Sequence, residues 1–327
     1  MTKIAIAGAG LAGLTLAHSL RDRAEITIFE KARGVGGRMA TRYADPWQFD
    51  HGAQFFTALT EPFQAFLLPL IDAGIVARWD ARFAEFVGTE QTAQWQWDAN
   101  RPHYVGTPKM NAVAKHLAPG LDIQLATEIG TAERSGTGWN LADSEGNPLG
   151  NFDWFVSTAP APQSATLLPP EFAHHNAIAV AEMRACFALM LGFDDPLPFE
   201  WDAAHVGEAD ISWMSVNSAK PGRDTAPSLI IHSTNAWADA HADDDRAGVQ
   251  AHLLAVASEI TGYDLSQATH IALHRWLYAN LPKREGPAAL IDTDNQLAAC
   301  GDWCIQGRVE AAFTSARALA EELNAMT

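Results

Sequence analysis

The feature that most constrains the fold is a glycine-rich turn near the start of the chain. The segment Gly8–Gly13 reads GAGLAG. It follows a short apolar run, Lys3 to Ala7, and precedes a helical pattern from Leu14 to Leu20. A second apolar run, Ile26 to Phe29, ends in Glu30. This order predicts a β-α-β unit with a GxGxxG turn and an acid about 20 residues further on, the pattern of a dinucleotide-binding fold.

Each position of the turn has a physical task. We expect Gly8 to permit the tight turn, Gly10 to let the backbone approach a pyrophosphate, and Gly13 to let the helix pack closely on the strand. The backbone N–H groups at the start of the helix, including those of Leu11 and Ala12, attract phosphate together with the helix dipole. The turn therefore predicts a pyrophosphate site.

The next residues favour a cofactor that is held by a second phosphate-binding segment of the protein. Glu30 can accept hydrogen bonds from ribose hydroxyls, whereas its charge would repel the 2′-phosphate of NADP. Arg33–Arg38 reads RGVGGR, so two arginines flank a flexible glycine pair that can fold over a pyrophosphate. We expect cofactor contacts from four neighbouring positions: Lys31, Gly37, Arg38 and Met39.

The other end of the sequence carries a second strand–turn–helix pattern. Leu297–Asp302 reads as a buried strand that ends in an acid, and Gly307 opens an Ala-rich helix that runs to about Leu323. A helix N-terminus at this place would stabilise negative charge on a bound group.

These motifs resemble the flavin-containing amine oxidase superfamily, in which RxxGGR and DxGA segments follow the dinucleotide turn. The second segment corresponds to Phe49–Thr57. The resemblance implies non-covalent FAD, with the isoalloxazine ring beside Gln54, Phe55 and Phe56. It further implies an adenine contact through the backbone of Ile129, a ribityl or pyrophosphate contact from Asp302, and backbone near Val309 at the flavin N1/O2 edge.

The resemblance also gives the expected fold class and domains. The fold is α/β, a Rossmann-type FAD-binding domain of the amine oxidase/hydroxybenzoate hydroxylase type with a second, mixed-sheet substrate domain. Residues 1–57, 105–161 and 269–327 form the expected FAD-binding domain, and residues 58–104 and 162–268 the substrate domain. Within them, Ile123 to Ile129 begins an expected β-meander, and Val249, Leu253, Val256 and Ile260 follow helical spacing.

Composition limits the classes of partner. The net charge of −17 argues against general affinity for nucleic acid or anionic lipid. The three cysteines, Cys186, Cys300 and Cys304, form neither a disulfide framework nor a zinc motif, which favours a reducing compartment. No apolar run of about 20 residues and no signal-peptide pattern is apparent, so we expect a cytoplasmic protein. Oligomeric state stays open.

The combination of GGRMATR, FDHGAQFF, YVGTP and GDWC with GRVEAA is similar to the renalase-like branch of the superfamily. That resemblance implies an oxidase that transfers hydride from the 2-dihydro or 6-dihydro isomers of NAD(P)H to flavin and then to O2, giving NAD(P)+ and H2O2. Loss of hydride leaves an aromatic ring, so no catalytic base is required. We expect no metal. The expected substrate-side residues are Thr57, Trp97, Phe187 and Arg308.

Several alternatives remain at this point. An amine oxidase or desaturase would use the same fold, and a non-catalytic flavin-binding redox sensor would need no substrate. His51 is interpreted as structural rather than catalytic, and Asp243–Asp245 as a solvated helix start rather than a metal site. Cys300 and Cys304 leave open a covalent flavin link, although a buried strand residue and a loop thiol are the simpler interpretation.

Overall fold

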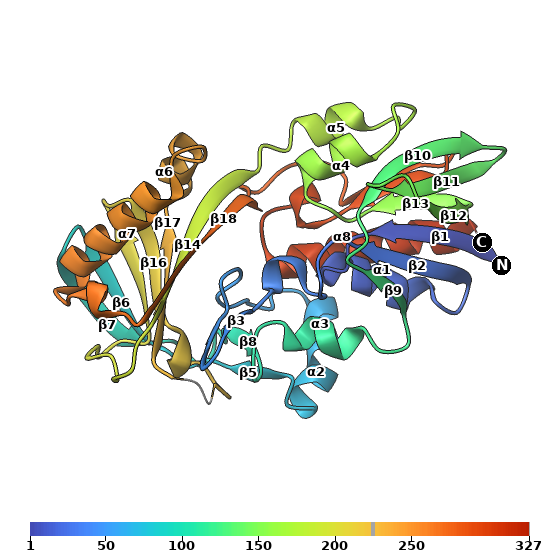
Figure 1. Cartoon of the computed structure of the whole chain (residues 1–327). Helices are drawn as coiled ribbons and strands as arrows, with labels where there is room; N and C mark the ends of the chain where they lie inside the picture. The colour runs from blue at the N-terminus through green and yellow to red at the C-terminus, as the bar shows by residue number, and fades with distance from the viewer. Residues whose placement is uncertain (224–225, 327) are drawn as a thin grey trace. The chain divides into compact units, whose positions relative to one another are not determined.

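The structure is a computed structural model that describes residues 1–223 and 226–326. The chain divides into two compact units (Figure 1), and each is assembled from separated segments. The first unit contains Met1–Arg38, Ala114–Met183 and Asn280–Thr327, of which Thr327 lies outside the described residues. The second unit contains Met39–Val113 and Arg184–Ala279.

A six-stranded sheet organises the first unit, in the order β19-β20-β13-β1-β2-β9. All neighbouring pairs from β20 to β9 are parallel, and β19 is antiparallel to β20. The strands are β1 Thr2–Ala7, β2 Ala24–Glu30, β9 Asp122–Leu125, β13 Trp154–Ser157, β19 Ala289–Asp292 and β20 Leu297–Cys300. The predicted β-α-β unit is confirmed, because α1 (Leu11–Leu20) joins β1 to β2.

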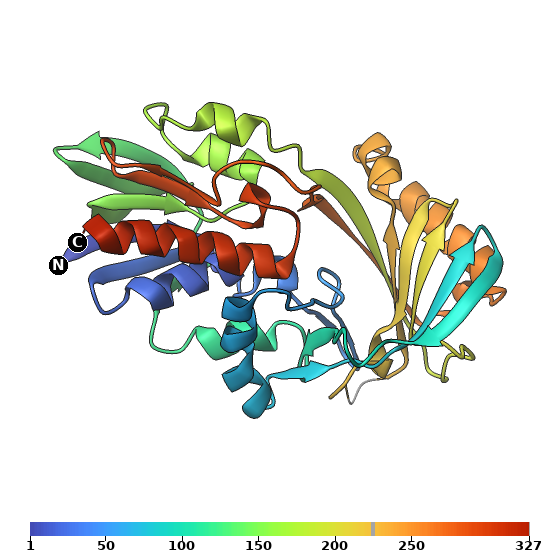
Figure 2. The same ribbon diagram turned by 180° about the vertical axis from the view of Figure 1, so that it is seen from behind.

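Two apolar layers enclose this sheet. On one face α1 and α8 (Val309–Met326) pack side by side, as Figure 2 shows, over a core that includes Ile6, Ile28 and Leu319. On the other face Phe155 and Trp139 join a three-stranded antiparallel sheet and two short helices to the core. Those elements are β10 Ile129–Ser135, β11 Gly138–Asp143, β12 Pro148–Phe152, α4 Ala161–Leu167 and α5 His175–Ala179. Sheet faces alternate along each strand, so buried strands need apolar residues at every position.

The expected meander begins later than the sequence suggests. Ile123 to Ile129 does not form one strand, because β9 ends at Leu125 and joins the parallel sheet beside β2. Ala126 then adopts a positive φ of 53° and turns the chain, and the meander starts at Ile129. Periodicity cannot reveal such a break inside a mixed apolar run.

The second unit is built on a seven-stranded sheet in the order β18-β14-β17-β16-β15-β6-β7. Its strands are β6 Arg82–Val87, β7 Glu90–Gln96, β14 Arg184–Gly192, β15 Ala203–Gly207, β16 Ile211–Val216, β17 Ser228–Ser233 and β18 His270–Asn280. One face is covered by α6 (Asn235–Ala240) and α7 (Arg246–Thr261), whose Val249 and Leu253 enter the core. The predicted helix is thus confirmed, with Asp245 as its N-cap and Gly262 in the left-handed conformation at its end.

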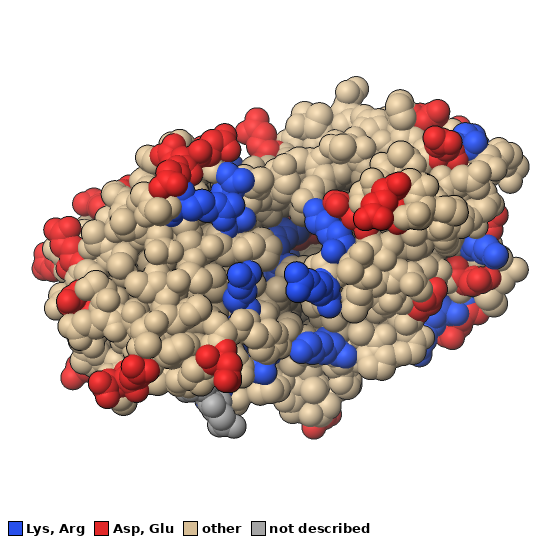
Figure 3. Space-filling view, viewed as in Figure 1, with Lys and Arg blue, Asp and Glu red and all other residues tan. Residues whose placement is uncertain are grey.

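The remaining elements of this unit are short. They are β3 Arg42–Ala44, β4 Trp47–Phe49, β5 Val76–Arg78, β8 Tyr104–Gly106 and α2 Glu61–Asp72, while α3 (Ala112–Leu117) crosses the boundary between the units. On the face seen in Figure 3, acidic and basic side chains lie next to one another over the α6 end of the unit, where Arg184 pairs with Asp239 and Arg275 with Asp243. Among the described residues, no helix has the length and apolar character that a membrane span needs.

The two compact units divide the chain at other positions than the expected FAD-binding and substrate domains, which are defined by ligand contacts and stay a prediction. Residues 39–57, 105–113 and 269–279 pack with the second unit, and residues 162–183 pack with the first. Sheet pairing and helix packing explain the placement of two of these segments. β18 continues the seven-stranded sheet beside β14, and α4 and α5 cover the six-stranded sheet.

Candidate functional site

The glycine turn of the first unit has the geometry that a pyrophosphate needs. Gly8 has a φ of +106°, which side-chain-bearing residues rarely adopt. A Cβ on Gly13 would lie 2.0 Å from the carbonyl oxygen of Gly8, whereas a Cβ on Gly10 would meet no heavy atom within 4 Å. The start of α1 has no side-chain cap and no acid in its first turn, so the N–H groups of Leu11 and Ala12 lack a competing side-chain anion there.

Glu30 fixes this turn as well as ending β2. Its carboxylate accepts hydrogen bonds from the backbone N–H groups of Ala9 (2.8 Å) and Ala32 (2.8 Å). The residue is 8% exposed. A carboxylate has about four lone-pair sites, so acceptor capacity remains for ribose hydroxyls. Sequence reasoning gave Glu30 only the ribose role and missed its bond to the turn.

Neighbouring residues surround this acid on the first unit. The backbone N–H of Thr127 donates to the carbonyl of Glu30 (3.0 Å), which brings the start of β10 to the end of β2. Ile129 is buried there and packs in the core with Phe29. Lys31 is exposed and lies 3.7 Å from the carboxylate of Glu128. The structure thus brings three predicted cofactor-contact residues, Glu30, Lys31 and Ile129, to one edge of the sheet.

The second glycine segment lies directly against the first. The N–H of Gly36 donates to the carbonyl of Ala9 (2.9 Å), and Gly37 has a φ of +52°. A Cβ on Gly37 would lie 3.4 Å from the Cα of Gly10. Both glycine motifs therefore present backbone at the same place, as two clamps on one pyrophosphate would. Arg33 is exposed beside them.

Arg38 and Asp302 come together from opposite ends of the sequence. The two guanidinium NH2 groups of Arg38 donate to both carboxylate oxygens of Asp302, one of them at 2.9 Å. Asp302 is 5% exposed and lies in a 3-10 turn, Asp302–Cys304, rather than on the strand itself, which ends at Cys300. Val309 is the first residue of α8. The pairing places the acid, the arginine and a helix start in one region of the first unit.

The thiols are poor candidates for covalent attachment. Cys300 and Cys304 are buried, with 0% and 5% exposure. Burial raises the pKa of Cys304 to about 12 and that of Cys300 well above its ordinary value. The thiolate is the reactive form, so neither thiol is activated.

The second unit contains a buried ionic cluster that the sequence did not reveal. Asp50 accepts hydrogen bonds from the hydroxyl of Thr41 (2.7 Å) and the N–H of Met110 (3.0 Å), and it pairs with the guanidinium of Arg223. The ammonium nitrogen of Lys220 lies 3.7 Å from the same carboxylate. Burial alone would raise the pKa of Asp50, but the two cations and the hydrogen bonds lower it.

Gln54 is held by this cluster. Its side-chain oxygen accepts from the hydroxyl of Ser215 (2.9 Å) and from Lys220 (3.1 Å), and its NH2 group donates to the carbonyls of Asp50 and Gly52. All four hydrogen-bonding positions of the amide are therefore used within the unit. A flavin contact from Gln54 would have to come from its backbone.

His51 belongs to a neutral cluster of histidine and tryptophan. Its ring lies 4.8 Å from that of His274 and stacks on Trp276 at 5.0 Å. The carbonyl of His51 interacts with the rings of Trp276 (2.9 Å) and His232 (3.2 Å). Burial, helped by His274, lowers the pKa of His51 to about 3, and burial lowers the pKa of His232 and of His274 to about 4. The three rings are uncharged at neutral pH.

A second aromatic cluster surrounds Trp97, one residue past the end of β7. The ring of Trp97 stacks on His103 with centroids 3.8 Å apart, and Phe55 meets its edge at 5.0 Å. Trp79 and Trp213 complete the cluster at 5.3 and 6.4 Å from Trp97. The indole Nε1 atoms of Trp79 and Trp213 and the Nδ1 atom of His103 are buried without a hydrogen-bond partner among the described residues. Such groups call for a water or a ligand.

The other predicted substrate-side residues have mixed placements. Thr57 is half-buried and follows Phe56, whose ring stacks on Tyr104. Arg308 is exposed, and its side chain has no partner among the described residues. Phe187 is 1% exposed and packs against Trp237 in the core between β14 and α6, so the structure does not present it to a substrate. Strand alternation could not tell which face of β14 is covered by helices. Met39 is buried in the second unit.

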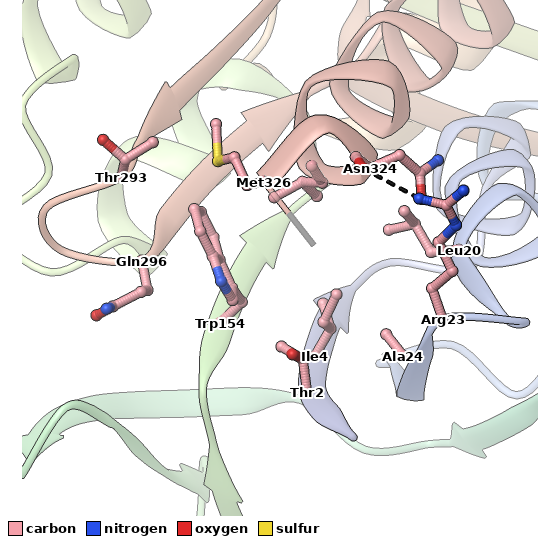
Figure 4. A pocket seen from close by; sticks show the side chains of 11 residues that line it. Thr2, Ile4, Leu20, Arg23, Ala24, Trp154, Thr293, Gln296, Asn324 and Met326 are labelled. Carbon is pink, nitrogen blue, oxygen red and sulfur yellow. Dashed lines mark hydrogen bonds between the residues drawn. The ribbon is translucent and has the colours of Figure 1, made fainter.

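A cavity of about 310 Å³ lies elsewhere in the first unit (Figure 4). Thr2, Ala24 and Trp154 line it, and these residues start β1, β2 and β13. Ligands of open parallel sheets bind at the carboxyl ends of the strands, where the glycine turn lies. This cavity is therefore at the opposite edge from the candidate site. The part of the chain that the structure describes contains no group of three His, Cys, Asp or Glu side chains placed to hold a metal ion.

The fold and the doubled glycine clamp define a Rossmann-type dinucleotide-binding flavoprotein. Comparison with protein families agrees: residues 6–68 match the NAD(P)-binding Rossmann-like domain, and residues 84–324 match the flavin containing amine oxidoreductase family. The chain belongs to this flavin containing amine oxidoreductase family, its cofactor is FAD, and it is a flavin-dependent oxidoreductase.

Individual relatives are more distant. A protein from Exiguobacterium sp. 255-15 that carries a provisional assignment as protoporphyrinogen oxidase superposes with a TM-score of 0.78 over 100% of this chain and 99% of its own, at 15% identity. Putrescine oxidase bound to putrescine gives 0.68 over 99% of both chains, at 11% identity. These identities establish a shared fold alone. Prenylcysteine oxidase 1-like of Bos taurus is 38% identical over 73 residues, which are 21% of this chain and only 15% of that protein.

Proposed function

We propose that this protein is an FAD-dependent oxidase of misplaced dihydronicotinamides, the 2-dihydro or 6-dihydro isomers of NAD(P)H. The observation that carries the proposal is the aromatic cluster around Trp97. It combines flat ring surfaces with three buried ring nitrogens, those of Trp79, His103 and Trp213, which have no hydrogen-bond partner in the part of the chain that the structure describes. A nicotinamide ring is flat and bears a carboxamide that both accepts and donates hydrogen bonds.

The residues of the first unit fit the proposed non-covalent FAD. The open space at Gly10, the uncapped start of α1, and Glu30 at the end of β2 match a pyrophosphate and a ribose. Arg38, Asp302 and the start of α8 would hold the remaining phosphate, ribityl and ring-edge groups. We further propose that Phe49–Thr57 of the second unit faces the flavin. When bound, FAD supplies the hydride acceptor and a route for electrons to O2.

The protein's own part in such a reaction is positioning. A dihydropyridine that loses hydride becomes an aromatic cation, so no side chain has to remove a proton. The neutral rings of His51, His232 and His274 are consistent with a site that needs neither acid nor base. Aromatic walls would set the distance to the reacting carbon at about 3–3.5 Å and exclude water. Arg308, which is exposed, would attract the anionic substrate against the net charge of −17.

Two alternatives have support of their own. The family match and the likeness to putrescine oxidase favour an amine oxidase, and a flavin-binding redox sensor would use the FAD site without turnover. Anaerobic mixing with 2-dihydro-, 6-dihydro- and ordinary 4-dihydro-NAD(P)H, and with a simple amine, separates them. We expect rapid bleaching by a misplaced isomer and slow bleaching by the 4-dihydro form. Bleaching by the amine alone would replace the proposal with an amine oxidase, and no bleaching would favour the sensor.

A further inference from the structure

The buried ionic cluster of the second unit has an unbalanced charge. Asp50, Lys220 and Arg223 are 1%, 2% and 9% exposed. With both cations protonated, the cluster carries two positive charges and one negative charge. Arg223 remains protonated in proteins and forms the close pair with Asp50. Lys220 is therefore the cation without a full counter-ion, and an uncompensated buried charge is costly.

The cluster ties together three parts of the second unit. Asp50 and Gln54 lie in the segment Phe49–Thr57. Arg223 donates to the carbonyl of Gly106 (2.7 Å), and Lys220 follows the short 3-10 helix Asn217–Ala219. Asn217, in the same 3-10 helix, holds the backbone at the start of that segment. Its amide oxygen accepts from the N–H of Asp50 (3.4 Å), and its NH2 group donates to the carbonyl of Gln48 (2.8 Å).

We propose that Lys220 is a positioning residue of the redox site: it fixes the amide of Gln54 and places a switchable positive charge behind the segment Phe49–Thr57. The proposal rests on the proposed function only for the placement of that segment along the flavin. Lys220 lies 3.1 Å from the oxygen of Gln54 and 5.4 Å above the ring of Trp79. It thus links the ionic cluster to both Gln54 and the aromatic cluster.

The switch follows from the surroundings of the amine. The charged and titratable groups that interact with it are Asp50, Arg223 and His232. Burial lowers the pKa of Lys220 to about 7, with Arg223 lowering it and Asp50 opposing the shift. Below that pH the cluster carries a net charge of +1, and above it the charge is zero. A positive charge behind the flavin-facing segment would favour the more negative, reduced form of a bound flavin.

Two substitutions should fix the charge at position 220, one in the positive state and one in the neutral state. Lys220→Arg keeps a permanent positive charge, and Lys220→Met keeps the length without a charge. The flavin midpoint potential of the native protein should match that of Lys220→Arg at pH 6 and that of Lys220→Met at pH 9. We expect the two variants to differ by about tenfold in the two-electron reduction equilibrium, which is about 30 mV. Lys283→Met, an exposed lysine of the first unit, should follow the native protein throughout.

A second readout does not involve the cofactor. The unfolded lysine has a pKa near 10.5 and the folded one near 7, so between these values the unfolded chain binds more protons and stability rises with pH. Relative to Lys220→Met, the unfolding equilibrium constant of the native apoprotein should fall by up to tenfold for each unit that the pH rises between 7 and 10.5. The unfolding equilibrium of Lys220→Arg should not show this pH dependence.

These outcomes separate the two proposals. A native potential that keeps a constant offset from both variants between pH 6 and 9 overturns the switch, as does an unfolding difference independent of pH. If Lys220→Met fails to fold, Lys220→Arg and the native protein still decide, since they must coincide at pH 6 and diverge at pH 9. None of these measurements uses a dihydronicotinamide, so the switch can hold even if that substrate is wrong.

Discussion

At the scale of single residues, Glu30 has two roles that can be measured separately. Its carboxylate organises the turn through Ala9 and would also bind the ribose. Glu30→Ala should weaken FAD binding by about 1.5–3 kcal/mol, the range for hydrogen bonds to a charged group. It should also destabilise the apoprotein by about 1–3 kcal/mol, because the buried N–H of Ala9 loses its partner. Titration with FAD and urea unfolding of the apoprotein measure the two effects.

Glu30→Gln is the matched control for this change. The amide keeps one acceptor oxygen but has no charge, so it should recover part of the stability and less of the FAD affinity. An alanine variant with unchanged FAD affinity would reduce Glu30 to an organiser of the turn.

Arg308 gives a second prediction at this scale. If it binds an anionic part of the substrate, Arg308→Ala should weaken substrate binding or slow anaerobic flavin reduction by about 10- to 150-fold, equivalent to about 1.5–3 kcal/mol. FAD content should not change. Arg317→Ala is the comparison in α8, the helix that follows Arg308. Arg317 pairs with Glu321 at the surface and lies over the ring of Phe313, so its removal should alter reduction little. Equal behaviour of the two variants in stopped-flow reduction would remove Arg308 from the site.

At the scale of elements, substitutions at two glycines of the turn should affect FAD binding and protein stability separately. Gly10→Ala places a methyl group where no protein atom lies within 4 Å, so the apoprotein should keep its stability while FAD binding falls at least tenfold. Gly13→Ala forces a Cβ to 2.0 Å from the Gly8 carbonyl, so α1 must shift and the apoprotein should lose about 1–3 kcal/mol or more. Gly207→Ala is the control, because Gly207 belongs to the second unit and a Cβ there would meet its nearest heavy atom at an ordinary contact distance of 3.7 Å.

Thermal unfolding with and without FAD distinguishes the three glycine variants. A Gly10→Ala protein that binds FAD normally would show that the pyrophosphate does not approach this position.

The elements that the sequence predicted are those whose signals are local. The strand, glycine turn, helix and acid of residues 3–30 are contiguous, and so are the caps of α7. The pairing of Asp50 with Arg223 joins residues that are 173 positions apart, and no local pattern records it. Phe187 shows the same limit: alternation gives two faces of β14, and both are buried, so only the packing of α6 shows which face the helices cover. Arg38 and Asp302 were both predicted, but not that they would pair.

At the scale of the whole molecule, the neutral histidines predict loss of stability in acid. The pKa of His51 is lowered to about 3 and that of His232 to about 4, from an unfolded value of 6.5. Between these values the unfolded chain binds more protons, so the contribution of the two histidines to stability is fully present above pH 6.5 and is lost as the pH drops towards 4. Each unit by which a pKa is lowered on folding corresponds to about 1.4 kcal/mol in the free energy of unfolding.

Urea unfolding of the apoprotein between pH 7.5 and pH 4.5 tests this sign. His51→Gln should flatten the dependence, whereas His116→Gln, at an exposed position, should leave it unchanged. A native protein whose unfolding midpoint rises on acidification would contradict the burial of neutral imidazoles.

The order of strands in the first unit also bears on how the protein is made. β13 pairs with β1 on one side and with β20 on the other, and β20 comes only at Leu297–Cys300. At about 5–20 residues per second, the ribosome exposes the free edge of β13 for several seconds or more before its partner emerges. An unpaired strand edge invites contact with other chains. Nascent chains should therefore depend on chaperones during this interval, and stop codons before residue 297 should yield aggregates rather than a smaller flavoprotein.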